Sequence, residues 1–71
     1  MATKNLKSVL LSLRIEGGSV TGIVKGDFTV EDVASGSALV ELEADTSLTD
    51  AKAAIIAAMG EDGSTVVDET S

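Results

Sequence analysis

The chain has 71 residues and a formal net charge of −7, and it contains neither cysteine nor histidine. The length allows one small domain, and the missing residue types exclude a disulfide scaffold, a thiol nucleophile and a Cys/His zinc site. The charge opposes binding to nucleic acid and to anionic membranes. We therefore expect a non-enzymatic protein with no cofactor, no bound metal, no nucleic-acid partner and no membrane partner. Ser12 and Arg14 interrupt the first apolar run too early for a signal peptide, and no apolar run is long enough to span a membrane, so we expect a cytoplasmic protein.

The first regular segment, residues 7–16 (KSVLLSLRIE), alternates between apolar and polar positions over most of its length. A period of two indicates a strand with one buried face. Its inward residues are Val9, Leu11, Leu13 and Ile15. Gly17-Gly18 follows, and this pair predicts a two-residue hairpin turn because both turn positions need a positive φ. A second strand is therefore expected from Ser19 to about Val30.

A turn at these two glycines sets the register of the predicted hairpin. It places Leu13 opposite Gly22, and at the far end it places Lys7 opposite Phe28. Gly22 and Gly26 each lie across from a large aliphatic residue, which leaves a shallow trough where another segment could approach closely. The alternative is that these glycines mark bulges or strand twist.

The stretch that follows the second strand, TVEDVASGS, interrupts the strand pattern. Thr29 and Asp32 are suited to cap a single helical turn, and residues 35–37 are typical of a loop. A third strand is expected from about Ala38 to Ala44. Because the connections are short, the simplest topology is an antiparallel three-stranded meander.

A helix is predicted from Leu48 to Met59. Ser47 and Asp50 match a loose capping box, and Gly60 is suited to end the helix. The helix is apolar nearly all round, whereas one sheet covers only one side of it. We expect another protein surface, most economically a second copy of the chain, to cover the far side. The alternative is a solvent-exposed alanine flank.

The residues after Gly60, EDGSTVVDETS, contain four acidic residues and no basic residue. This composition predicts an acidic, flexible tail over residues 61–71, attached to a single domain over residues 1–60. Val66 and Val67 could instead pair with the sheet edge of a partner. An EF-hand alignment puts Ala58 and Gly60 at ligand positions, so it is excluded.

The sequence thus predicts an α+β domain in which a C-terminal helix packs on a three-stranded sheet. A small chain without disulfide or metal is short of stabilising burial, which favours association. The apolar strip on the outer sheet face and the far side of the helix supply the predicted oligomer interface, formed by Leu6, Leu10, Ile23, Ala53, Ile56 and Ala57.

Two functions fit these observations. The first is a non-catalytic, self-associating structural or assembly protein, such as an accessory subunit of a virion or another larger particle. The second is a small acidic inhibitor whose carboxylates occupy a basic site on a nuclease, a defence protein or a toxin. A small-ligand binder with a pocket at an oligomer interface is a third hypothesis.

Overall fold

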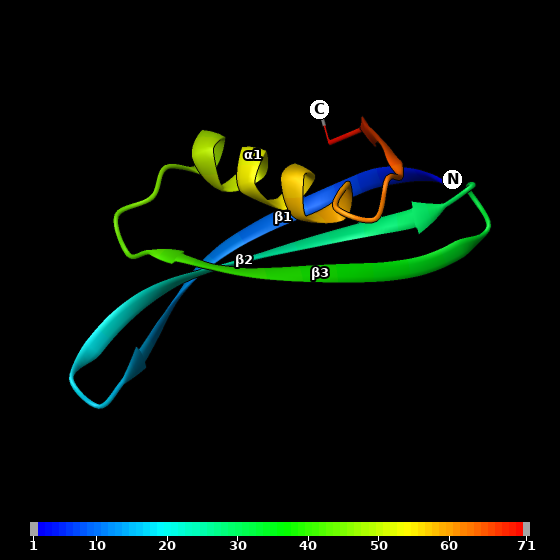
Figure 1. Cartoon of the computed structure of the whole chain (residues 1–71). Helices are drawn as coiled ribbons and strands as arrows, with labels where there is room; N and C mark the ends of the chain where they lie inside the picture. The colour runs from blue at the N-terminus through cyan, green and yellow to red at the C-terminus, as the bar shows by residue number, and fades with distance from the viewer. Residues whose placement is uncertain (1, 71) are drawn as a thin grey trace.

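The computed structural model describes residues 2–70. The chain folds into one α-helix packed on one face of a four-stranded mixed sheet (Figure 1). In chain order the elements are β1 (Thr3–Glu16), β2 (Ser19–Val30), β3 (Ala34–Glu43), α1 (Leu48–Met59) and β4 (Thr65–Asp68). The strand order is β3-β2-β1-β4, with β4 parallel to β1. The α+β class is confirmed, but the expected three-stranded antiparallel sheet is corrected to four strands.

The β1–β2 hairpin turns at Gly17 (φ 57°) and Gly18 (φ 81°), as predicted. The predicted register holds from Ser8 to Glu16, and Leu13 lies opposite Gly22. It fails beyond Ser8, because a bulge between Leu6 and Ser8 shifts the pairing by one residue. The partner of Phe28 is therefore Leu6 and not Lys7.

This bulge decides on which face Leu6 lies. A one-residue shift in a strand moves all the side chains beyond it to the opposite face. Leu6 is fully buried in the core, so its predicted place on an exposed outer strip is wrong.

The connection between β2 and β3 is a tight turn over residues 31–33 and not a helical turn. Glu31 and Asp32 both have positive φ values, of 53° and 57°. Because the turn is short, β3 begins at Ala34, and residues 35–37 form strand where a loop was expected. A Cβ on Gly36 would lie 2.8 Å from the Phe28 ring, so glycine allows the ring to rest on the backbone here.

The helix begins and ends where the sequence predicts. The backbone N–H of Asp50 donates to Ser47 Oγ at 3.2 Å, which caps the first turn. Gly60 follows the helix with φ −91°, so its position does not use the left-handed conformation. The core lies between α1 and the sheet and consists of Leu6, Val24, Ala51, Ile55 and Met59, all at most 2% exposed.

Of the two glycines of the predicted trough on β2, Gly26 faces this helix, whereas a Cβ on Gly22 would meet the Glu43 carbonyl oxygen of β3 at 2.7 Å. A Cβ on Gly26 would lie 2.7 Å from Ile55 Cγ1 and 3.2 Å from Leu6 Cδ1. Ile55 therefore occupies the space that a side chain at position 26 would need. The segment that approaches the strand at Gly26 is thus the protein's own helix.

The fourth strand comes from the segment predicted as a tail. Val66 lies opposite Lys4 in the β4–β1 ladder. The Lys4 ammonium donates to the Met59 carbonyl at 2.9 Å and to the Asp62 carboxylate at 3.1 Å. The acidic segment is thus attached to the basic start of β1, a long-range contact that its composition does not reveal.

Candidate protein interface

The β1–β2 hairpin extends beyond the part of the sheet that the helix covers (Figure 1). A strand rises about 3.3 Å per residue and a helix about 1.5 Å, so the 14-residue β1 is more than twice as long as the 12-residue α1. Residues 12–21, which include the Gly17-Gly18 turn, form what we call the hairpin arm. The helix is too short to cover it.

Apolar side chains are exposed on the helix side of the arm. Leu13 is 62% exposed, Ile15 is 76% exposed, and Val20 is also exposed. The sequence places these residues on the same face as the core, and the register confirms that alternation. They lie beyond the helix, however, so the sheet alone cannot bury them.

The opposite face of the sheet carries a second group of exposed apolar side chains. Leu10 and Leu39 flank Lys25 in the cross-strand register, and they are 64% and 68% exposed. Ile23, one position along the same face of β2, is half-buried. The predicted residues Leu10 and Ile23 are thus brought close together. Leu39 was missed, although it has the outward parity in the run ALVELE.

The three predicted interface residues on the helix lie on the other side of the sheet. Ala53 and Ala57 are exposed, while Ile56 is half-buried and packs against the core. Because the sheet separates this group from Leu10 and Ile23, one flat partner surface cannot cover both groups. The structure therefore divides the predicted interface into two surfaces.

One edge of β1 is open along most of its length. β4 pairs with β1 only from Thr3 to Leu6, and within residues 2–70 no strand pairs with that edge from Ser8 to Glu16. An unpaired strand edge presents backbone N–H and C=O groups that can pair with another chain. We call residues 8–16 the open edge.

The open edge lacks the features that usually discourage strand pairing. It contains no proline, and its charged residues, Arg14 and Glu16, lie at the end nearest the turn. The other outer edge of the sheet, along β3, carries the exposed Glu41 and Glu43 and includes Gly36. Charge and glycine disfavour edge-to-edge pairing, so the open edge of β1 is the better template.

A surface hollow of about 290 Å³ lies where the open edge meets the helix. Val9 from β1 and Leu48 from the start of α1 supply its apolar part, and Leu48 is 56% exposed. Lys7, Ser8, Lys52 and Thr70 complete the lining. The hollow thus has both apolar and polar lining residues, and it lies directly beside unpaired backbone groups.

The perturbed carboxylates lie near β4 and not on the arm. Hydrogen bonds from Ser64, and then from Lys4, lower the pKa of Asp62 to about 2. Thr70 and then Lys52 lower the pKa of Asp68, while Lys7 and then Asn5 lower that of Glu69. These contacts attach the C-terminal segment to the rest of the domain, and they account for the shifts without a reactive group.

Comparison of the chain with protein-family models, with curated proteins and with solved structures finds no match. Among the described residues, α1 is too short to cross a membrane. No group of three acidic side chains in residues 2–70 is placed to hold a metal ion. The surfaces described above are therefore the features that bear on function.

Proposed function

We propose that this protein is a non-catalytic, self-associating structural or assembly subunit. The observation that carries the proposal is the hairpin arm, which exposes Leu13 and Ile15 beyond the reach of the helix. Exposed apolar groups of this kind typically mark sites of protein association. The open edge beside them adds unpaired backbone groups to the same surface.

The modest core supports the same proposal. Five apolar residues are fully or almost fully buried, and no disulfide is available to a chain without cysteine. Small domains of this kind often gain stability from association. An arm that reaches beyond the domain body is also suited to join neighbouring subunits, which fits an accessory subunit of a larger particle such as a virion.

The acidic-inhibitor function requires a different kind of surface. It requires carboxylates to make the main contact with a basic partner, as the net charge of −7 would allow. The arm instead combines apolar side chains with Arg14 and Glu16, whose charges cancel. Its composition favours an apolar interface over an acidic one.

Light scattering over a concentration series, at low salt and at about 1 M salt, tests the proposed function. We expect the mass to rise to that of an oligomer and to remain there at high salt. At about 1 M salt the Debye length is about 3 Å, so charge interactions are screened, whereas the burial of apolar side chains is not weakened. A chain that stays monomeric at the highest concentration would contradict self-association. The inhibitor function would then be preferred.

A further inference from the structure

We propose that the open edge of β1 binds the open edge of a second copy of this chain, in an antiparallel pairing about a two-fold axis at Ser12. This inference rests on the self-association proposed above and names its partner and geometry. The pairing joins the two four-stranded sheets into one continuous sheet, with both helices on the same face.

The ends of the open edge favour this symmetric arrangement. β4 occupies the edge of β1 as far as Leu6, and the Gly17-Gly18 turn ends the strand on the other side. A two-fold axis requires the same surface on both copies. When the axis passes through Ser12, the whole segment from Ser8 to Glu16 is paired, and any other register leaves part of it unpaired.

The backbone groups needed for this pairing point in the required direction. In an antiparallel pair, alternate residues direct their N–H and C=O groups away from the neighbouring strand. Glu16 and Ser19 flank the two-residue turn and form a hydrogen-bonded pair, so the even residues of β1 bond to β2. The odd residues of the open edge therefore direct their N–H and C=O groups outward. In the proposed register Leu11 therefore exchanges hydrogen bonds with Leu13 of the second copy, and Val9 does so with Ile15.

The proposed register also places an exposed side chain next to the hollow. Ile15 of the second copy lies opposite Val9, and residues directly opposite each other share a face of the sheet. That face is the helix side, where Val9 and Leu48 line the hollow of about 290 Å³. Ile15, which is 76% exposed in the monomer, is thus buried, and symmetry repeats this contact.

On the opposite face, Arg14 of the second copy lies across from Leu10. The aliphatic part of an arginine side chain covers apolar surface while its charged end stays in water. Leu10, which is 64% exposed in the monomer, would be covered in this way. Each copy thereby buries exposed apolar groups on both faces of its sheet.

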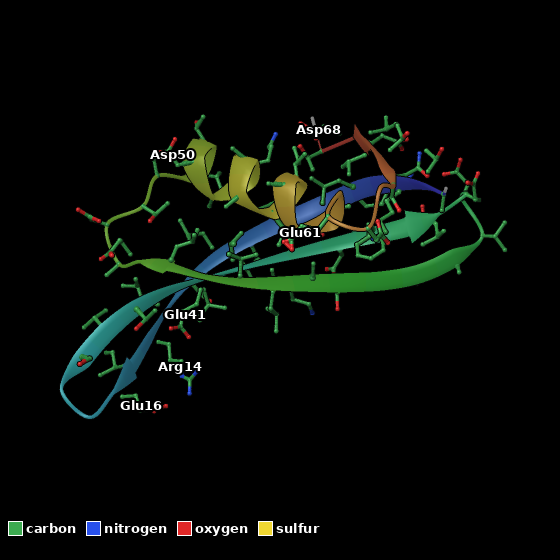
Figure 2. All side chains as sticks on the ribbon, viewed as in Figure 1. Arg14, Glu16, Glu41, Asp50, Glu61 and Asp68 are labelled. Carbon is green, nitrogen blue, oxygen red and sulfur yellow. The ribbon has the colours of Figure 1, made fainter. Side chains whose placement is uncertain are left out.

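The open edge is electrically neutral, so its own charges neither attract a basic partner nor repel a second copy. Two copies with a charge of −7 each repel one another overall. Along the open edge, however, the only charges are Arg14 and Glu16, which form an ion pair near the turn (Figure 2). Glu16 of the second copy comes to lie opposite Ser8, beside Lys7. Lys7 also contacts Glu69 and Asp32, and the Ser8 hydroxyl donates to Asp27. Lys7 therefore offsets only part of the repulsion between Glu16 and the acidic groups at this end of the contact.

Cross-linking at Ser12 tests the register directly. The chain has no cysteine, so Ser12→Cys introduces one thiol on the proposed axis. Opposed residues at this type of position have Cα atoms about 4.5 Å apart, within the range that a disulfide spans. We expect mild oxidation to convert the variant into a covalent dimer. The matched control, Ser37→Cys on the same sheet face of β3, should remain mostly monomeric.

A second pair of variants tests the interface without a cross-link. Ile15→Lys places a charge against Val9 and Leu48 of the second copy, and should raise the dissociation constant of the dimer at least about 30-fold. Leu39→Lys makes the same change at a similarly exposed site away from the open edge, and should raise it less than about threefold. Because both positions are exposed in the monomer, both variants should fold, as circular dichroism would show.

These measurements separate the pairing from self-association in general. If the wild type never exceeds the monomer mass, the proposed function fails. If the wild type associates, but Ser12→Cys cross-links no faster than Ser37→Cys and Ile15→Lys associates normally, the edge pairing is overturned and self-association stands. Rapid cross-linking together with the selective effect of Ile15→Lys would support both.

Discussion

Gly26 allows the helix to approach the sheet closely. Its position opposite Val9 leaves room for Ile55, which is fully buried above it. An added Cβ would meet Ile55 Cγ1 at 2.7 Å, a distance that forces the packing to shift. One missing side chain on β2 thus determines how α1 lies on the sheet.

We expect Gly26→Ala to destabilise the fold by about 1–3 kcal/mol, the usual cost of overpacking a core. Urea denaturation at a fixed protein concentration would measure it, since association adds to the apparent stability. Ser37→Ala, an exposed change on the neighbouring strand, should stay within about 0.5 kcal/mol. Equal stability of Gly26→Ala and the wild type would show that the helix does not rest on β2 at this point.

The strand β4 is held by side chains as well as by its short ladder. Its residues pair with Thr3 to Leu6 of β1, and Lys52 reaches Asp68 at 3.2 Å. Asn5 and Lys7 both donate to Glu69. The order of this element therefore depends on ionised carboxylates, unlike the order of the apolar core.

Acid should consequently loosen β4 before it unfolds the core. Asp62 has a folded-state pKa of about 2, below its ordinary 3.8, so its contribution is complete above that ordinary value and is lost as the pH falls through about 2. The lowered pKa values of Asp68 and Glu69 act in the same direction. We expect amide protection in β4, corrected for intrinsic exchange, to fall over this range while that of α1 persists.

Asp62→Asn is the matched control for this experiment, because it keeps a hydrogen-bond acceptor near Ser64 but removes the titrating group. It should make the protection of β4 less dependent on pH. Simultaneous loss of protection in β4 and α1 on acidification would show that the two elements unfold as one unit.

At the scale of the whole molecule, the main feature is the mismatch in length between the long hairpin and the short helix. The molecule measures 41 × 22 × 17 Å, and the arm occupies one end of its long axis (Figure 1). Apolar residues on the arm keep the strand alternation of the core, yet no other element formed by residues 2–70 covers them. This mismatch is the physical reason to place the interface on the arm.

The local features of the fold could be predicted from the sequence. Gly17-Gly18 forms the turn because glycine tolerates a positive φ, and the helix runs from Leu48 to Met59 because Ser47 caps it. The pairing of Leu13 with Gly22 follows from that turn and from a period of two. Each of these features depends on residues close together in the chain.

The remaining features depend on long-range contacts. Composition did not predict β4, because its partner, the start of β1, lies at the other end of the chain. The bulge before Ser8 places Leu6 in the core. The alternation of apolar and polar residues in the sequence does not reveal such an extra residue in a strand. Likewise, Leu13 and Ile15 have a core pattern but are exposed. Alternation sets the face on which a side chain lies, whereas the length and position of the helix decide whether that face is covered.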